Sequence, residues 1–202
     1  MILAQIMMTV KCIFRIAHSI QYSAKSIKFV NYNFSDKIEK MDKAEKVVNL
    51  LKQKKLTIAA AESCSGGYLS YLLTQTPGSS QVFKGGVIVY TLQAKTKLLK
   101  IPLSELKKTE GVSEKISLLL AKNIKKTLKS DIGVSIVGFA GPGAKKGVKV
   151  GTVYICATDK TNSITKKLLL TGNRDAVRKK ASLALIDMLY KMIKKDEDGG
   201  RS

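Results

Sequence analysis

The segment Ala61-Glu62-Ser63-Cys64-Ser65-Gly66-Gly67 carries the residue types best suited to chemistry. Ser63 follows a short apolar run and precedes a turn of small residues, which predicts a hydroxyl presented at the end of a buried strand. Small residues let a substrate approach the backbone, and N–H groups that begin a helix are unpaired, so this turn could hold an oxyanion or a phosphate. The simpler interpretation is a tight strand–helix connection in which the serine only caps the helix.

Cys64 is a second candidate nucleophile, because a thiol at a helix N-terminus can have a lowered pKa. The alternative is an ordinary small buried residue. The only histidine is His18, in the N-terminal part of the chain. Residues 41–202 therefore contain no Ser-His-Asp or Cys-His triad and no histidine-based metal site. Their chemistry must use Ser, Thr, Tyr, Lys, Cys, Arg or carboxylates, and no metal ligand set is predicted.

Two further groups could contact an anionic ligand. The loop Gly138-Phe139-Ala140-Gly141-Pro142-Gly143 follows an apolar strand, and its backbone amides could hold a phosphate. Arg174 and Arg178 are four residues apart, so they share one helix face and could clamp a phosphate. The alternatives are a plain strand exit and an arginine pair that is solvated or bound to Asp175 or Asp187.

The periodicity of apolar residues predicts the elements that must position these groups. Helical spacing and short apolar runs alternate from residue 42 onward, and a strand hairpin comes late. This order favours an α/β fold, a three-layer α/β/α sandwich with a mixed, mostly parallel sheet. Helices are expected at 42–54, from 68 to 74, at 91–100, 114–129 and 174–194, and strands at 56–61, 86–90, 133–138, 150–158 and 163–170.

The composition favours an anionic partner. The net charge is +21, and 32 of the 36 basic residues are lysines. Such a charge suits nucleic acid or a phosphorylated small molecule. The sequence has no arginine-rich cluster and no basic stripe with interleaved aromatics, so no nucleic-acid partner is expected, and a general bias toward lysine explains the excess equally well. The three cysteines lack metal-ligand spacing and cannot all pair, which favours a reducing, cytoplasmic compartment.

Residues 1–40 differ from the rest of the chain. The run from Met1 to Val10 is apolar but too short to span a membrane, and no acidic residue precedes Asp36. This extension is interpreted either as a start assigned too far upstream, with Met41 as the true beginning, or as a targeting or membrane-surface segment. One folded domain is predicted over residues 41–195, followed by a flexible tail at 196–202.

Several separated motifs occur in one order that resembles a known family. They are the Ser63 segment, the strand from Gly85 to Tyr90 followed by Ala94-Lys95, the Gly138–Gly143 loop, Val150-Gly151-Thr152-Val153, and Gly172-Asn173-Arg174-Asp175-Ala176-Val177-Arg178. The likeness, over about residues 42–195, is to the CinA carboxy-terminal domain family, whose characterised members are nicotinamide-nucleotide amidohydrolases. The resemblance implies the same three-layer fold and a domain that works without a cofactor.

The resemblance also implies a reaction and its residues. The substrate would be nicotinamide mononucleotide, and its carboxamide would be hydrolysed to nicotinate mononucleotide and ammonia. The catalytic residues implied are Ser63 as the nucleophile, Lys95 as the base, and Tyr90, which would orient or relay the proton. The implied substrate contacts are Cys64, Ser65, Gly66, Gly67, Gly141, Gly143, Arg174 and Arg178.

The sequence departs from the family pattern in three places, the mildest of which is Ser65, where the family commonly has threonine. Leu92 stands where the family usually has asparagine, and the loop at residues 144–149 is basic where the family's is rich in glycine. A relative that has lost catalysis and binds a nucleotide or nucleic acid is therefore the second interpretation. A homo-oligomer is compatible with either.

Overall fold

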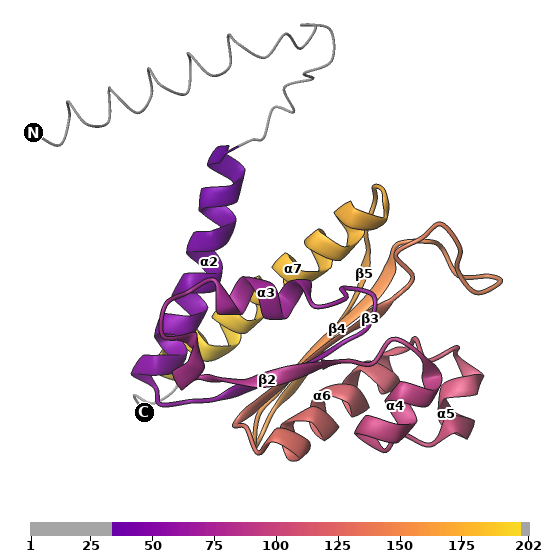
Figure 1. Ribbon diagram of the computed structural model, residues 1–202, viewed down its shortest axis with the longest axis horizontal. Coiled ribbons are helices and arrows are strands. Elements are labelled where there is room, and N and C mark those ends of the chain that lie inside the picture. The colour runs from indigo at the N-terminus through magenta and orange to yellow at the C-terminus, as the bar shows by residue number, and fades with distance from the viewer. Residues whose placement is uncertain (1–33, 199–202) are drawn as a thin grey trace, which may run out of the picture. The chain divides into compact units, whose positions relative to one another are not determined.

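The structure is a computed structural model that describes residues 34–198. Strands and helices alternate along the chain in the way that the apolar periodicity predicts (Figure 1). The helices are α2 (Phe34–Gln53), α3 (Tyr68–Thr74), α4 (Leu92–Leu99), α5 (Leu103–Lys108), α6 (Glu114–Leu128) and α7 (Arg174–Asp198), and the strands are β1 (Ile58–Glu62), β2 (Phe83–Ile88), β3 (Ile132–Gly138), β4 (Thr152–Thr158) and β5 (Ser163–Leu169).

The five strands of the described chain form one mixed sheet in the order β2-β1-β3-β4-β5. β1 lies at the centre of a parallel group, paired with β2 on one side and β3 on the other. β4 is antiparallel to both β3 and β5, and it forms the predicted late hairpin with β5. Four strands therefore run in one direction, as the expected mixed, mostly parallel sheet requires.

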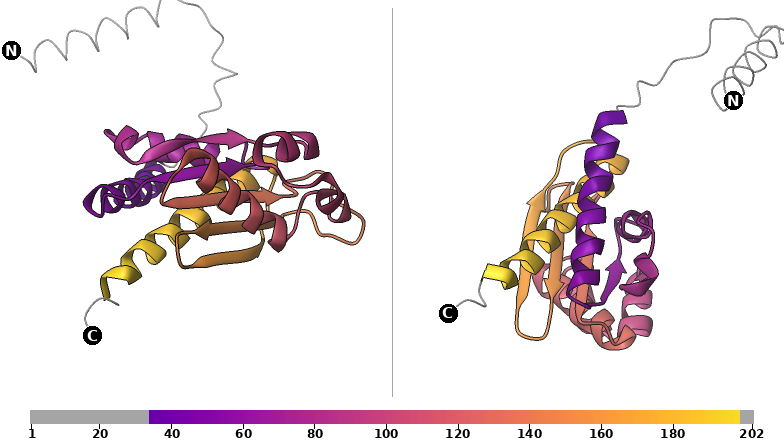
Figure 2. Two further views of the ribbon diagram at one scale, coloured as in Figure 1. Left: turned by 90° about the horizontal axis from the view of Figure 1, so that it is seen from below. Right: turned by 90° about the vertical axis from the view of Figure 1, so that its left-hand side faces the viewer.

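Helices cover both faces of the sheet, and the three-layer prediction is confirmed (Figures 1 and 2). On one face α2, α3 and α7 pack over a core that includes Leu51, Leu69 and Leu185. On the other face α4, α5 and α6 pack over a second core that includes Leu99, Leu106 and Leu120. β1, Ile58-Ala59-Ala60-Ala61-Glu62, is buried along its whole length, and its three central alanines let both helix layers approach the centre of the sheet closely.

The first described helix is longer than predicted. α2 begins at Phe34 and not at residue 42, because residues 34–41 lack the apolar spacing that revealed the rest of the helix. Met41 thus falls within α2, and the domain boundaries at 41 and 195 stay predictions. The remainder of the proposed extension, residues 1–33, and the end of the proposed tail, residues 199–202, lie outside the described residues.

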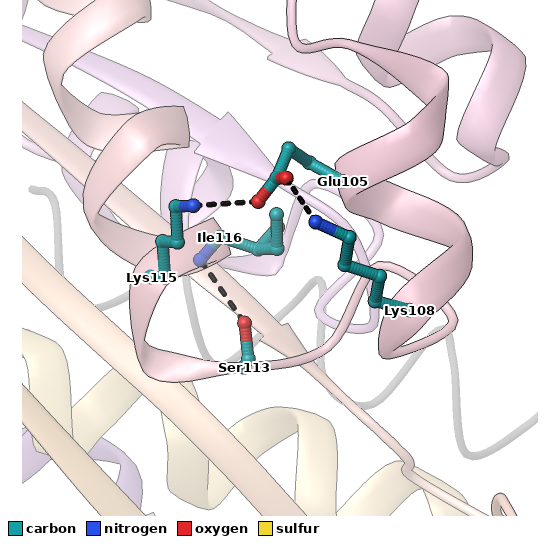
Figure 3. Close-up of polar contacts among 5 residues, drawn as sticks. All are labelled: Glu105, Lys108, Ser113, Lys115 and Ile116. Carbon is teal, nitrogen blue, oxygen red and sulfur yellow. Dashed lines mark hydrogen bonds and ion pairs between the residues drawn. The ribbon is translucent and has the colours of Figure 1, made fainter.

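The short helix α5, which no periodicity predicted, is fastened to the start of α6 (Figure 3). The carboxylate of Glu105 accepts hydrogen bonds from Lys108 and from Lys115, each at 2.5 Å. These two lysines, Lys108 first, lower the pKa of Glu105 to about 2. The side chain of Ser113 accepts a hydrogen bond from the Ile116 N–H and caps α6, as its sequence context predicts. The Lys115 pair joins α5 to the start of α6, whereas the Lys108 pair lies within α5.

Candidate active site

Ser63 lies directly after β1, where a turn of four small residues leads into α3. Its N–H donates to the carbonyl of Ile136 on β3 at 2.9 Å, so the backbone at Ser63 is still held by the sheet. The side chain is 7% exposed. The predicted strand–turn–helix is therefore present, and it presents the Ser63 hydroxyl at the carboxyl edge of the parallel strands, where ligands bind in open α/β sheets.

Lys95 lies in the first half of α4, and its side chain reaches the Ser63 hydroxyl. Its Nζ lies 3.1 Å from the Ser63 Oγ and donates to the carbonyl of Val89 at 2.8 Å. The side chain is 2% exposed. Burial lowers the pKa of Lys95 to about 8, while the neighbouring Cys64 opposes this shift. A lysine with such a pKa can exist as a neutral amine near neutrality and accept the proton of a serine hydroxyl.

The Glu62 side chain fixes the backbone that leads from the turn into α3. Its carboxylate is 1% exposed and accepts hydrogen bonds from the N–H groups of Gly67, Leu69 and Ser70 and from the Ser70 hydroxyl, at 2.6–3.1 Å. The alternation of a strand sends successive side chains to opposite faces, so Glu62 reaches α3 while Ser63 reaches α4. Glu62 thereby fixes the start of α3, and with it the backbone that follows Ser63.

This carboxylate corrects one expectation about the turn. The N–H of Gly67 is bonded to Glu62 and that of Gly66 to the Ser63 carbonyl at 3.1 Å, so neither is free for a ligand. Gly67 has a φ of 93°, a left-handed conformation that favours glycine. Within the described residues, the N–H groups of Cys64 and Ser65 have no acceptor from another residue. These two amides, directly after the serine, are the ones able to stabilise an oxyanion.

The Ser65 side chain is also unsatisfied. Its hydroxyl is fully buried and has no hydrogen-bond partner in the described part of the chain. Buried polar groups in native proteins are nearly always hydrogen-bonded, so an orphan hydroxyl two residues after Ser63 indicates a position that a ligand can satisfy.

Cys64 does not have the environment of a nucleophile. It is 5% exposed, and burial raises the pKa of its thiol to about 12. A thiol with this pKa is fully protonated near neutrality and is a weak nucleophile. Of the two interpretations of Cys64, the small buried residue fits the structure.

The arginine pair contacts the site, although not as a free clamp. Arg174 donates to the carbonyl of Gly141 and to the Tyr90 hydroxyl, and it links α7 to the loop after β3 and to the residue two places after β2. Arg178 donates from Nε to the Ser65 carbonyl at 3.0 Å. The alternative ion pairs are not formed, because Asp175 pairs with Lys179 and Asp187 with Lys43.

The remaining predicted residues differ in whether they contact other residues of the site. Tyr90 is 55% exposed, and its hydroxyl accepts a hydrogen bond from Arg174 and contacts neither Ser63 nor Lys95. Gly141 is brought to the site through Arg174. Gly143 is exposed, with nothing within 4 Å of where a side chain would begin. The turn, Lys95, Tyr90, Gly141 and both arginines thus gather at one edge of the sheet, and Gly143 makes no contact with them.

Comparison with known proteins decides the family. The sequence profile described as the CinA C-terminal domain matches residues 40–193. This chain belongs to the CinA C-terminal domain family. The CinA-like protein of Thermotoga maritima is 41% identical over 157 residues, which cover 77% of this chain and 38% of that protein. The CinA-like protein of Amoebophilus asiaticus is 38% identical over 154 residues, which cover 75% of this chain and 37% of that protein.

Solved structures of CinA proteins share the fold. The competence or damage-inducible protein from Enterobacter asburiae has a TM-score of 0.73 and 27% identity, and the match covers 76% of this chain and 98% of that one. A CinA superfamily protein from Klebsiella pneumoniae gives a TM-score of 0.74 at 25% identity, with 77% and 98% covered. The chain spans between 32% and 41% of the length of the first two curated CinA relatives that it matches.

The contribution of Glu62 was the part of the site that sequence reasoning missed. The sequence did indicate its direction, because alternation along β1 places it on the face opposite Ser63. Nothing in the sequence indicated that α3 would begin above that face. The site also includes the Val89 carbonyl, a backbone group that no side-chain pattern reveals.

Proposed function

We propose that this CinA domain is an amidohydrolase that cleaves the carboxamide of nicotinamide mononucleotide to nicotinate mononucleotide and ammonia. The observation that carries the proposal is the buried contact of 3.1 Å between Lys95 Nζ and Ser63 Oγ. A serine beside a lysine of lowered pKa is a nucleophile with its base, and this pair needs no histidine. The family resemblance supplies the substrate, which the geometry alone does not select.

The proposed reaction proceeds through an acyl-enzyme. Neutral Lys95 takes the Ser63 proton as Oγ attacks the carboxamide carbon, and the resulting oxyanion accepts hydrogen bonds from the Cys64 and Ser65 amides. The protonated Lys95 then gives its proton to the leaving nitrogen, and the C–N bond breaks to release ammonia. A water molecule, deprotonated by Lys95, attacks the ester, and the nicotinate product leaves as Ser63 regains its proton.

Other residues of the site orient the substrate in this scheme. The orphan hydroxyl of Ser65 would bond the carboxamide, because it is buried and unpartnered. Tyr90 would act together with Arg174, which already donates to its hydroxyl and to the Gly141 carbonyl. Arg178 would fix the turn through the Ser65 carbonyl.

The test is ammonia release from nicotinamide mononucleotide by the purified chain, with nicotinate mononucleotide identified as the second product. Ser63→Ala is expected to lower kcat by about a thousandfold or more while the unfolding temperature hardly changes. Cys64→Ser is the matched control at the next residue, and it should keep activity within a fewfold. Turnover that survives Ser63→Ala but not Cys64→Ser would identify the thiol as the nucleophile. Nucleotide binding with no ammonia release would favour a relative that has lost catalysis.

A further inference from the structure

Leu92, the first residue of α4, is a neighbour of Lys95 on the helix surface, because residues three apart lie one above the other. Side chains of a helix point back toward its N-terminus, which directs the long side chain of Lys95 over the turn that begins with Leu92. Leu92 is half-buried and packs against the core beneath α4, α5 and α6. The helix therefore places an apolar side chain next to the proposed base.

Gly111, between α5 and α6, shows where these two side chains meet. It is buried, its N–H donates to the carbonyl of Leu106 at 2.7 Å, and its φ of 72° is a left-handed conformation that favours glycine. A side-chain atom added at Gly111 would lie 2.7 Å from Cδ2 of Leu92 and 3.5 Å from both Cδ and Cε of Lys95. Leu92 thus fills the space beside this glycine, and the methylene groups of Lys95 lie against the same backbone.

The Lys95 ammonium has no carboxylate partner among the described residues, since its contacts are the Ser63 hydroxyl and the Val89 carbonyl. Burial lowers its pKa to about 8, and Cys64 opposes this shift. The other charged or titratable groups on the elements around it are exposed, protonated or bonded elsewhere. Cys64 is protonated, Glu62 bonds α3, Tyr90 bonds Arg174, Glu105 bonds Lys108 and Lys115, and Lys97, Lys100, Lys107, Glu110 and Glu114 are exposed.

Exclusion from water is therefore the main influence on the charge of Lys95, and Leu92 is well placed to provide it. Lys95 is 2% exposed, whereas Leu92 is only half-buried, so Leu92 is the outer of the two neighbours and covers the inner one. An ammonium group loses more hydration free energy on burial than the uncharged amine does. An apolar cover consequently favours the uncharged amine.

We propose that Leu92 is a positioning residue of the catalytic site, whose side chain keeps water from Lys95 so that the uncharged amine can take the Ser63 proton. The inference rests on the proposed amidohydrolase function for the reaction that this base serves. The departure from the family pattern at Leu92 then favours the active form of the base, and it does not indicate that catalysis has been lost.

The test changes the polarity of residue 92 more than its size. Leu92→Asn keeps the branched shape but brings an amide and its water to Lys95, so kcat/KM for nicotinamide mononucleotide should rise at a pH about one unit higher than in the wild type. Near neutrality kcat/KM should be about tenfold lower. At high pH, where the amine is uncharged in both proteins, the two values should converge.

Three further variants distinguish this effect from packing. Leu92→Met stays apolar and should restore the wild-type profile. Leu92→Ala removes the cover without adding a polar group, so it should move the profile in the same direction as Leu92→Asn, and it provides the test if Leu92→Asn does not fold. Leu98→Asn makes the same change at a position of α4 that is 47% exposed, and it should leave the profile unchanged.

A titration without substrate separates this proposal from the proposed reaction. The NMR signal of the Lys95 Cε carbon, assigned by its absence from Lys95→Met, reports protonation of the amine. Its midpoint should lie about one pH unit higher in Leu92→Asn than in the wild type or Leu92→Met. This result without ammonia release would refute the reaction and retain the effect of Leu92. An unchanged midpoint in Leu92→Asn, or rates lowered equally at every pH, would overturn the proposal and leave Leu92 with a packing role alone.

Discussion

The side chain of Lys95 lies in a buried environment that disfavours its charged form. With 2% of its surface exposed, it has lost most of its hydration, and its partners are one carbonyl and one hydroxyl. Burial therefore lowers its pKa to about 8 from the ordinary value of 10.5. Roughly a tenth of the molecules then carry the neutral amine at neutral pH, and most carry it about one unit above the pKa.

The activity should consequently rise with pH as Lys95 loses its proton. We expect kcat/KM for nicotinamide mononucleotide to increase through an apparent pKa of about 8. Lys95→Arg keeps the charge but cannot supply a neutral base, so it should be nearly inactive at every pH. Initial rates across the pH range, for the wild type and this variant, provide the measurement. Appreciable turnover by Lys95→Arg would refute the assignment of the base.

The same titration should appear in stability. Because the folded pKa of about 8 lies below the ordinary value of 10.5, the folded state binds fewer protons between these limits, and stability increases with pH across that window. Lys95→Met lacks this group. The free energy of unfolding of the wild type relative to Lys95→Met should rise by about 3 kcal/mol from neutral pH to the top of the window. A difference that does not change with pH would mean that Lys95 is not desolvated.

Among the elements, α3 depends most on a single side chain. It begins at Tyr68 with no N-cap side chain of its own, and Glu62 bonds its first N–H groups from the preceding strand. Those bonds restrain the backbone that follows Ser63, since a buried carboxylate with several donors fixes all of them together.

Glu62→Gln should loosen this arrangement without changing the shape of the side chain. One carboxylate oxygen becomes an NH₂ group that faces backbone N–H donors, so we expect a loss of about 1–3 kcal/mol in stability. A shifted Ser63 should also lower kcat about tenfold or more. Ser70→Ala, which removes one of the four bonds, should lose less of both. Denaturant unfolding and steady-state kinetics test this, and wild-type values for Glu62→Gln would contradict it.

Elements with a strong local pattern were predictable, while contacts between distant residues were not. α6 was expected at 114–129 and spans 114–128, because Ser113 caps it and its apolar face repeats regularly. β2 was expected at 86–90 but spans Phe83–Ile88. Its start was missed because Gly85 and Gly86 have low β-strand propensity. No local pattern distinguishes Lys95 from 31 other lysines. Its role depends on α4 packing against the end of β1, and only the resemblance pointed to it.

In the whole molecule the site is built from both helix layers and the sheet between them. Parallel strands β1, β2 and β3 end at one edge and bring Ser63, Tyr90 and the Gly138–Gly143 loop together. α4 supplies Lys95 from one layer, and α7 supplies Arg174 from the other. Figure 1 shows the start of α3, α4 and the loop after β3 at the same end of the sheet. Catalysis in the proposed function therefore requires all three layers to be packed.

The same dependence makes the domain boundary testable. α2 belongs to the layer of α7, and the buried apolar residues within its part from 43 to 53 are Ala44, Val47, Val48 and Leu51. All four follow Met41, and the family profile begins at residue 40. A chain that starts at Met41 keeps this face, so it should unfold cooperatively and retain kcat and KM within about twofold, as expected for changes away from buried contacts. None of the helices at residues 34–198 combines the length and apolarity needed to cross a membrane.

The comparison needs the full chain, the chain from Met41 and one from Leu50, which lacks Ala44, Val47 and Val48. We expect the first two to have the same unfolding midpoint and the third to be destabilised severely, because burying those three side chains contributes about 1–2 kcal/mol each on transfer from water. Thermal and denaturant unfolding, followed by ammonia release at one pH, would rank them. A chain from Met41 that unfolds without cooperativity would show that residues before it pack into the domain, and the boundary would move toward Phe34, where α2 begins.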